Sequence, residues 1–361
     1  MQNRRILFAS SNRENIRSFS VFGPAFAYFS AKCYIFQERQ SSGNMLKRLI
    51  LVAATILISL SFVLTESGHA SARSDPTIYD IDINHSSTFW GIPMDSDTCG
   101  GTPPVGTCSP TPAWHIRAAF AYLMDKTQVV TSLGLSTSNI IDNMVPSSSY
   151  YTTPSANPWY LDWITSGLYS SVDTQSGVTG QTGFYNIGSG PDFCAATQHL
   201  VLAAGIGNDG MPWHDTNSDC VIDNPPTQLQ PIRFLISSTM PKRLVGLYLA
   251  SQINTVFGAS VVAVQIGSIG VFTPIVFNNS PPDDWELYTG SFSVTGHPDW
   301  LCSLYYYDTG TNFPSNYVFY NVPAYDAVVG SSSCPPLNKP SARLAEGIFG
   351  FTIGTIPVFW Q

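Results

Sequence analysis

The chain has 361 residues, with 16 lysines and arginines against 24 aspartates and glutamates, and 44% of its residues are hydrophobic. Eight of the basic residues and three of the acidic ones lie in residues 1–72, which leaves 8 basic and 21 acidic side chains in residues 73–361, a net charge of −13. This scarcity of cations argues against nucleic acid and against an anionic membrane surface as partners. The acidic, aromatic-rich composition is typical of a soluble exported protein.

Residues 45–72 have the order of a secretory signal peptide. Two basic residues are followed by sixteen apolar to small residues and then by a small-residue cleavage site that ends at Ala72. An uncleaved anchor is the alternative, but this run is short for a bilayer core of about 30 Å. We therefore expect translation to start at Met45, residues 1–44 to have no structural role, and the mature protein to be extracellular or periplasmic.

Residues 73–112 are expected to form a loop-rich entry segment that contains a disulfide. Besides Cys33, the chain has six cysteines, and an even number beyond a signal peptide indicates disulfides in an oxidising compartment. Several pairings are open, and one between the first two would close a short loop rich in glycine and proline. The six candidates are Cys99, Cys108, Cys194, Cys220, Cys302 and Cys334.

A first helix is predicted from Trp114 to Val130, because apolar residues recur there at helical spacing on one face. Its segment 116–126 reads IRAAFAYLMDK. Arg117 and Asp125 stand eight residues apart, so both return to nearly the same helical face. We expect them to anchor the two ends of this helix by hydrogen bonds.

An acidic loop follows further along the chain. Oxygen-bearing side chains stand at Asp215, Asn217, Asp219 and Asp223, which correspond to positions 1, 3, 5 and 9 of a calcium loop. Cys220 replaces the turn glycine of such a loop, and a proline stands where its bidentate glutamate belongs. Hydrogen-bonded Asx turns are therefore expected, with a bound calcium ion as the weaker alternative.

A strand–helix–strand unit is predicted next. Residues 231–237 read as a strand, Thr239 is expected to cap a helix with Pro241 in its first turn, Gly258 ends that helix, and residues 260–266 form a second strand. Such a unit requires a parallel strand pair with helices packed on the sheet. The predicted fold class is α/β.

The last part of the chain is predicted to complete the sheet. Residues 285–292 read as a strand, and residues 313–330 as a loop followed by a short helix. Residues 341–349 are expected to be helical, and residues 351–359 to form a closing strand.

Residues 290–326 carry an ordered motif: GHPDWL at 296–301 is followed by an NY pair, Tyr320, a proline and a YD pair that ends at Asp326. Together with the helix at 116–126 and the acidic loop, this motif resembles family 5 of the extracellular solute-binding proteins, the peptide- and nickel-type receptors of ABC importers. The resemblance covers about residues 110–360.

This resemblance implies a type II periplasmic-binding-protein-like fold, in which two α/β lobes close on a ligand. Residues 113–361 are expected to form one lobe, the second, because only about 45 residues separate it from the signal peptide and the long first-lobe segments of a full member are missing. Either the gene is a fragment or fusion, or a separate chain supplies the first lobe.

In peptide-binding members of this family, an acidic residue shortly before the proline of the third motif pairs with the amino terminus of the ligand. That place is occupied here by the apolar Val294, so an oligopeptide, a sugar or another small solute stays open. Polar and aromatic side chains near the motif could bind or stack such a solute. The candidate ligand-contacting residues are His297, Asp299, Trp300, Trp285 and Tyr305.

The leading hypothesis is therefore reversible capture of a small solute and its delivery to an ABC permease, without a cofactor. The sequence has no G-x-S-x-G, no H-E-x-x-H and no glycine-rich phosphate loop after a strand, so we do not expect an enzyme. Two alternatives are kept: a truncated surface or structural protein that retained the lobe but lost transport, and a secreted hydrolase.

Overall fold

A computed structural model of the chain describes residues 76–94, 110–141, 143–145, 191–277, 284–294, 297–307, 316–330 and 333–361. Contacts divide the chain into two units, residues 1–73 and residues 74–361, and every described residue lies in the second unit. The expected extension, the expected signal peptide, Cys99 and Cys108 lie outside the described residues.

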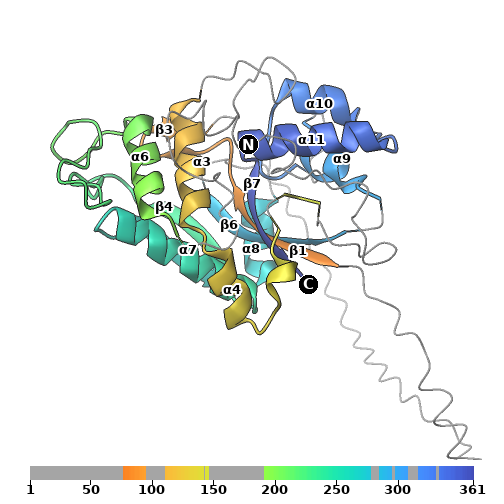
Figure 1. The fold of residues 1–361 in the computed structure, drawn as a ribbon, viewed down its shortest axis with the longest axis horizontal. Helices are drawn as coiled ribbons and strands as arrows, with labels where there is room; N and C mark the ends of the chain where they lie inside the picture. The colour runs from red at the N-terminus through yellow and green to blue at the C-terminus, as the bar shows by residue number, and fades with distance from the viewer. Residues whose placement is uncertain are drawn as a thin grey trace, which may run out of the picture. The chain divides into compact units, whose positions relative to one another are not determined.

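The second unit alternates strands and helices (Figure 1). Its strands are β1 (Thr77–Ile83), β2 (Thr88–Phe89), β3 (Ile92–Pro93), β4 (Ile232–Ser237), β5 (Val262–Gly267), β6 (Leu287–Ser293) and β7 (Thr355–Trp360). Its helices are α3 (Pro112–Leu123), α4 (Lys126–Ser132), the short 3-10 helix η1 (Thr137–Asn139), α6 (Phe193–Ala203), α7 (Lys242–Val256), α8 (Ile269–Val276), α9 (Trp300–Tyr305), α10 (Pro323–Val329) and α11 (Lys339–Thr352). No described helix has both the length and the hydropathy that a membrane span requires.

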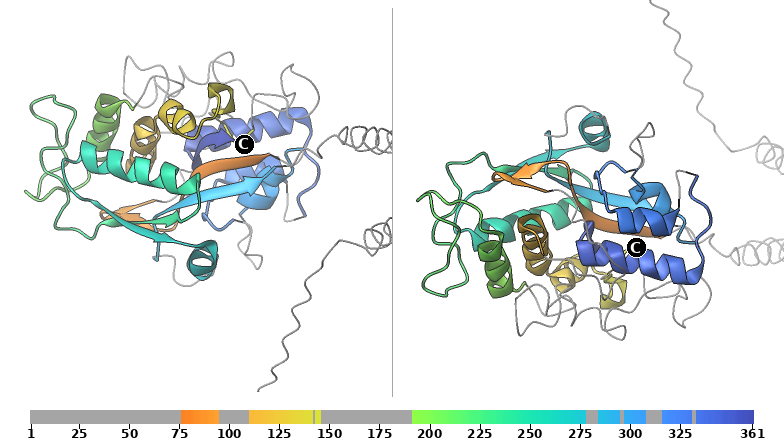
Figure 2. Two further views of the ribbon diagram at one scale, coloured as in Figure 1. Left: turned by 90° about the horizontal axis from the view of Figure 1, so that it is seen from below. Right: turned by 90° about the horizontal axis from the view of Figure 1, so that it is seen from above.

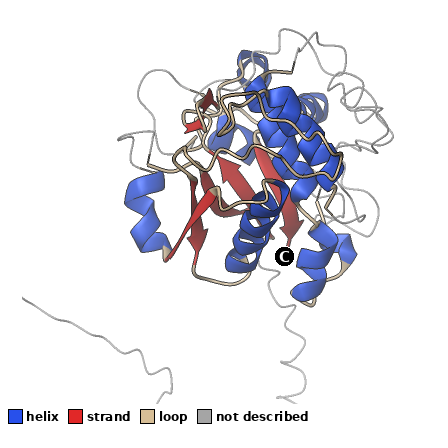
Figure 3. Cartoon of the chain, turned by 90° about the vertical axis from the view of Figure 1, so that its left-hand side faces the viewer, coloured by secondary structure: helices blue, strands red, loops and turns tan. Residues whose placement is uncertain are grey.

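The main sheet has five strands in the order β5-β4-β6-β1-β7, and β2 and β3 form a separate two-stranded sheet. Figure 3 shows the strands of the main sheet side by side, with helices around them. β4 runs parallel to both β5 and β6. β1 runs antiparallel to its two neighbours, β6 and β7. The expected α/β class is confirmed, with one reversed strand inserted near an edge of the sheet.

Helices cover both faces of this sheet (Figure 2). Alternate strand residues point to opposite faces, and in β4 Phe234 and Ile236 join a core built with α3, α6 and α7. Leu235, between them, joins the other core, which contains residues of α8, α9, α10 and α11. The sheet is therefore the middle layer between two apolar cores, and its strand ends are the places where backbone and polar side chains can reach solvent.

The predicted strand–helix–strand unit is confirmed as β4, α7 and β5, with the two strands parallel. Its helix start differs in detail from the prediction. Pro241 occupies the N-cap position of α7, and no side chain caps this end. Thr239 instead shares a hydrogen bond of 2.9 Å with the hydroxyl of Ser237, so its side chain serves the turn rather than the helix.

The predicted single helix from Trp114 to Val130 is broken into α3 and α4. Met124 is extended, with φ −83° and ψ 100°, and the carboxylate of Asp125 accepts a hydrogen bond from Gln128 N at 2.8 Å. Asp125 thus caps a new helix, because its side chain competes for the backbone donors that a continuous helix would use. The expectation that Arg117 and Asp125 anchor one helix was wrong in this respect.

β1 was not predicted, although it lies between β6 and β7 in the sheet. Its sequence TIYDIDI alternates, with Tyr79, Ile81 and Ile83 on the face of the first core. The opposite face carries Asp80 and Asp82, so the segment read as a polar entry loop. In the folded chain this polar face is buried as deeply as the apolar one.

Candidate functional site

A hollow of about 750 Å³ lies at one end of the sheet. It is bordered by the start of β1, the ends of β6 and β7, the chain that follows α4, and the turn before α7. Its lining residues are Thr77, Tyr79, Leu133, Leu135, Met240, Pro241, Ser293 and Gln361. The turn before α7 follows the carboxyl end of the parallel strand β4, and the crevice outside such strand ends is the usual ligand position in open α/β sheets.

Backbone pairing fixes the rim of this hollow. Thr77 N donates to Gln361 O at 2.8 Å, and Gln361 N donates back to Thr77 O at 2.9 Å. On its other side Thr77 is paired with Ser293 in the ladder between β1 and β6. The first residue of β1 and the last residue of the chain therefore lie side by side at the same hollow.

The side chains that line the hollow are apolar or neutral polar. The ring of Tyr79 stacks on Phe359, with ring centroids 4.7 Å apart, and burial raises the pKa of its hydroxyl. A rigid aromatic ring beside hydroxyl and amide groups suits a neutral, hydrogen-bonding solute better than an ion.

Two buried carboxyl groups stand on the opposite face of β1 from Tyr79. Asp80 is 1% exposed and Asp82 is fully buried. Burial is the main cause that raises the pKa of Asp80 well above its ordinary value, and the charge of Asp82 and a hydrogen bond with it add to this. Burial also raises the pKa of Asp82 to about 6, against the lowering effect of a hydrogen bond from Tyr317. Asp80 therefore keeps its proton to a higher pH than a solvent-exposed aspartate does.

The surroundings of this pair explain its position. The hydroxyl of Tyr317 donates to Asp82 Oδ2 at 2.7 Å. At Gly290, a Cβ atom would lie 2.3 Å from Asp82 Oδ2 and 2.4 Å from Asp80 Oδ1, so only glycine leaves room for both carboxyl groups. Burial lowers the pKa of Lys242, the first residue of α7, while both aspartates raise it. Asp80 and Asp82 are therefore buried ionisable groups that do not line the hollow.

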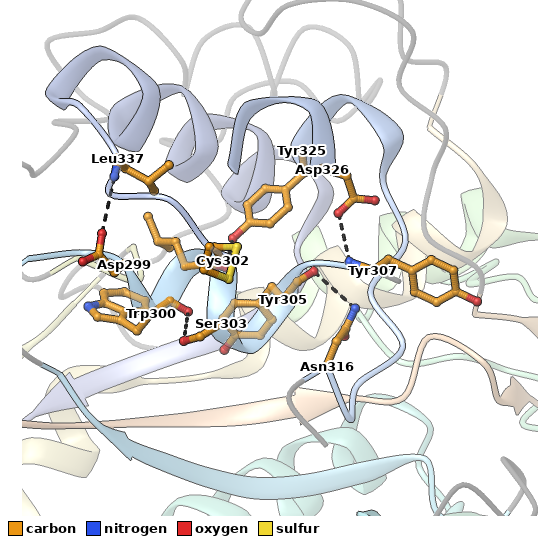
Figure 4. The surroundings of a disulfide bond; sticks show 12 residues. Asp299, Trp300, Cys302, Ser303, Tyr305, Tyr307, Asn316, Tyr325, Asp326 and Leu337 are labelled. Carbon is orange, nitrogen blue, oxygen red and sulfur yellow. Dashed lines mark hydrogen bonds between the residues drawn. A yellow bond between two sulfur atoms is a disulfide. The ribbon is translucent and has the colours of Figure 1, made fainter. Parts of the chain in front are cut away.

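The motif loop predicted to contact ligand forms a local structure of its own (Figure 4). His297 Nδ1 lies 2.6 Å from Asp299 Oδ1, and both side chains are partly exposed. Asp299 Oδ1 also accepts from Leu337 N at 3.4 Å. Trp300 is 7% exposed and packs against Phe292 with centroids 5.2 Å apart. None of these residues lines the hollow.

The other two predicted ligand contacts lie in the second core. Trp285 and Tyr305 are each 1% exposed. The ring of Tyr305 packs on Phe349 with centroids 4.4 Å apart, and its carbonyl accepts from Asn316 Nδ2 at 3.2 Å (Figure 4). Tyr305 thus joins helices α9 and α11, whereas the ring of Trp285 lies edge-on to Tyr288 of β6, with centroids 6.4 Å apart.

Four of the six candidate cysteines form two disulfides, a pairing that the sequence left open. Cys194 is bonded to Cys220, 26 residues further on, and Cys302 to Cys334, 32 residues further on. The first bond ties the start of α6 to the acidic loop, and the second ties α9 to the chain that leads into α11 (Figure 4). A smaller hollow of about 480 Å³ lies beside the first bond, against α6.

The acidic loop folds as a set of Asx turns. Asp215 Oδ2 accepts from Cys220 N at 3.0 Å, Asn217 Oδ1 from Asp219 N at 2.9 Å, and Asp219 Oδ1 from Val221 N at 3.0 Å. Asp223 Oδ2 accepts from both the amide and the hydroxyl of Thr216. These oxygens face backbone donors, and within the described ranges no three His, Cys, Asp or Glu side chains are grouped to hold a metal.

The framework residues of the resemblance are buried and hydrogen-bonded. Arg117 is fully buried, and its Nε donates to Thr352 O at 3.1 Å. The hydroxyl of Tyr320 lies 2.7 Å from that of Thr352. Asp326 Oδ1 accepts from Tyr307 N at 3.1 Å, and burial raises the pKa of Asp326 to about 6. These residues join α3, α10 and α11, so their role in the structure is architectural.

Buried histidines form a further polar group in the first core. His115 and His199 face each other with Nδ1 atoms 2.9 Å apart. Burial lowers the pKa of His115 to about 4, and burial with the neighbouring His115 lowers that of His199 to about 3. His85 is also buried, with a ring nitrogen 2.8 Å from Gly354 O, and its pKa falls to about 3.

Sequence reasoning missed most of the hollow. Thr77, Tyr79, Ser293 and Gln361 belong to no motif, and they meet because of strand pairing across more than two hundred residues. One signal was present: the apolar residue at the position assigned to a ligand-binding acid, Val294, directly follows Ser293 and is fully buried. From that substitution alone, an oligopeptide, a sugar or another small solute stayed open.

Comparisons with known proteins give no family name. No family model matches the sequence, and no curated protein matches it. Among solved structures, the chain is similar to the oligopeptide-binding protein AppA from Bacillus subtilis in complex with a nonapeptide, with 14% identity and a TM-score of 0.49 over 80% of this chain and 45% of that one. It is also similar to a periplasmic oligopeptide-binding protein of an ABC transporter from Thermotoga maritima, with 13% identity and a TM-score of 0.48 over 80% and 44%.

A third solved structure, a peptide-binding protein of a peptide ABC transporter, has 14% identity and a TM-score of 0.45 over 79% of this chain and 99% of that one. The chain thus spans less than half the length of the Bacillus and Thermotoga proteins. At these identities none of the three identifies a solute or a partner for this chain.

Proposed function

We propose that residues 74–361 form a solute-contacting lobe of an exported binding protein that serves an ABC permease. The observation that carries this proposal is the hollow of about 750 Å³, lined by uncharged side chains, at the sheet end where β1 begins and β7 ends. A second wall, from a further segment or a separate chain, would bury the solute surface that this hollow leaves exposed.

The chemistry of the lining favours a neutral solute. A peptide with a free amino terminus requires a carboxylate, but the acid position of the motif is the buried Val294. The two nearby carboxyl groups of Asp80 and Asp82 are buried on the other face of β1, and Asp82 accepts a hydrogen bond from Tyr317. Neutral oligosaccharides or blocked peptides therefore fit the hollow better than free peptides do.

Half of a binding cleft should bind weakly. Losing half of the roughly 8 kcal/mol of a micromolar receptor leaves a dissociation constant of about 1 mM, because the solute surface that the second wall would bury stays wet. We therefore expect the isolated chain to bind a neutral solute no tighter than about millimolar.

Ligand-detected NMR tests this proposal, since it reports millimolar binding. The chain is mixed with neutral oligosaccharides, blocked peptides and free peptides, and the same panel is applied to Ser293→Trp, which fills the hollow. The matched control is Ser251→Trp, at an exposed position on α7. Signals from neutral solutes that disappear in Ser293→Trp and persist in Ser251→Trp support the site. Equal signals in both variants, or selective binding of free peptides, would contradict it.

A further inference from the structure

The hollow of about 480 Å³ between α6 and the acidic loop, called the α6 hollow below, is separate from the site described above. On α6 it is lined by residues at helical spacing, among them Gln198, Val201 and Leu202, and on the acidic loop by residues that include Asp215. The other face of α6, with Leu200, packs in the first core. The volume of the α6 hollow suits a small molecule.

Covalent and hydrogen bonds fix the two sides of the α6 hollow. The disulfide of Cys194 and Cys220 joins α6 to the acidic loop, and the hydroxyl of Thr197 donates to Cys220 O at 2.8 Å. The carboxylate of Asp215 accepts from Cys220 N at 3.0 Å and from Asp219 N at 3.3 Å. An ionised carboxylate has roughly four acceptor positions, so Asp215 can accept from a bound molecule as well. Little of this wall has to become ordered on binding.

The electrostatics of the α6 hollow favour a cation. Among the described side chains that line it, Asp215 is the one that carries a charge. The helix α6 ends beside it at Ala203 with no basic residue in its last turn, and the carboxyl end of a helix attracts positive charge. The neighbouring His214 has one ring nitrogen 2.9 Å from Pro212 O and the other 3.9 Å from Asp209.

The protein places no lysine or arginine at the α6 hollow. Residues 74–361 contain seven of these residues. Arg117 and Lys126 are buried and donate to backbone carbonyls. Arg233 is paired with Asp284 and Glu286. Because its neighbours in β4 face the core that contains α6, Arg233 itself points to the opposite face of the sheet.

The other four basic residues begin two helices. Lys242 and Arg243 begin α7, whereas the acidic loop meets the far end of α7, where Ile222 N donates to Val256 O at 2.8 Å. A helix of 15 residues places these two ends about 20 Å apart. The last two lie at the start of α11, which packs in the second core: Lys339 and Arg343. A positive charge beside Asp215 therefore has to come from a bound molecule.

We propose that the α6 hollow binds a small organic ammonium ion that has an apolar body. The ammonium group donates to the carboxylate of Asp215, and such charge-assisted hydrogen bonds are stronger than neutral ones. The apolar body lies against Val201 and Leu202. Leu202 is 46% exposed in the protein alone, so covering it removes apolar surface from water, which stabilises the complex. This site does not depend on the neutral-solute site proposed above.

Phenethylamine is a suitable probe, with 2-phenylethanol as its neutral analogue and 3-phenylpropanoate as an anionic one. Ligand-detected NMR on the full chain measures their binding at physiological ionic strength, where general attraction to an acidic surface is screened. We expect phenethylamine to bind with a dissociation constant of about 1 mM. The alcohol should bind at least about tenfold more weakly, because it lacks the charge, and the anion more weakly still.

Two pairs of variants locate the binding. Asp215→Asn keeps an oxygen for Cys220 N but removes the charge, and should weaken phenethylamine binding at least about tenfold. Its control is Asp219→Asn, on the same loop but not at the α6 hollow, which should change the affinity less than about twofold. Gln198→Trp fills the α6 hollow from the helix and should abolish binding, whereas Ser293→Trp, in the other hollow, should leave it unchanged.

Several results would overturn the proposal. Equal affinity for phenethylamine and 2-phenylethanol would show that the charge of Asp215 does not select the bound molecule. Equal losses in Asp215→Asn and Asp219→Asn would show general attraction to an acidic surface in place of a site. Binding that survives Gln198→Trp, or that is absent from the wild type, would exclude the α6 hollow.

Discussion

The buried carboxyl group of Asp82 should make the stability of this protein fall as pH rises. Burial raises its pKa from 3.8 to about 6 in the folded chain, whereas the unfolded chain releases the same proton near pH 3.8. Between these values the folded state binds more protons, so folding is favoured by acid. This contribution is fully present below about pH 4 and is lost as pH rises through about 6.

The size of the effect follows from the shift. A change from 3.8 to about 6 corresponds to about 3 kcal/mol, at about 1.36 kcal/mol per pKa unit. Asp82→Asn removes the titration and keeps an oxygen that can accept from the hydroxyl of Tyr317. Relative to wild type, we expect Asp82→Asn to gain about 3 kcal/mol in free energy of unfolding between pH 4 and pH 8.

Urea denaturation at pH 4 and pH 8 measures this difference. The buried histidines also respond to pH, but they do so equally in both proteins and cancel in the comparison. Asp284→Asn is the control, because the side chain of this aspartate is 48% exposed. This replacement should change the free energy of unfolding by the same amount at pH 4 and at pH 8. If Asp82→Asn and wild type lose stability in parallel from pH 4 to pH 8, the reasoning about burial is refuted.

Two further predictions concern the disulfides and the buried histidines. Because Cys302 and Cys334 close a loop of 32 residues, replacing both by serine should lower the free energy of unfolding by about 3–4 kcal/mol, and an unchanged urea midpoint under oxidising conditions would contradict this. Burial lowers the pKa of His199 from 6.5 to about 3, so its stabilising contribution is present above pH 6.5 and is lost as pH falls. His199→Phe should make the loss of stability between pH 6.5 and pH 4 shallower in thermal unfolding, and an equally steep loss would contradict the assignment.

The part of the fold that could be predicted is the part specified by local pattern. β4, α7 and β5 follow from two short runs of β-branched and aliphatic residues that flank a helical period, with Gly258 in a left-handed conformation of φ +57° just beyond the helix. Competition between a side-chain cap and a continuing helix was harder to predict. The side chain of Asp125 starts a second helix where periodicity alone extends the first.

β1 shows why a regular pattern can be read as a loop. Its alternation was visible, but Asp80 and Asp82 made one face look exposed. The cost of burying them is reduced by the raised pKa of Asp80, by the hydrogen bond from Tyr317 and by the space above Gly290. Tyr317 and Gly290 stand more than two hundred residues away in the sequence. A single sequence does not indicate which distant residue will meet a polar strand.

The candidate site could not be assembled from sequence for a related reason. Its lining comes from five separate segments and consists of common neutral residues, such as Thr77, Ser293 and Gln361, that form no motif. The motif residues that drew attention, Trp285, Trp300 and Tyr305, are those whose size and geometry the core requires. A motif shows that certain residue types are required at certain positions. For large aromatic residues, packing in the core imposes that requirement at least as often as ligand binding does.

The separation of charge from the hollow has a functional consequence. The hydroxyl and amide groups at the hollow do not titrate between pH 4 and pH 8, and burial moves the pKa of Tyr79 further upward. Three carboxyl groups whose pKa is raised, Asp80, Asp82 and Asp326, do not line the hollow. A change in pH therefore reaches solute binding through the stability of the lobe and not through the lining. A neutral solute should accordingly bind with the same affinity across this range for as long as the lobe stays folded.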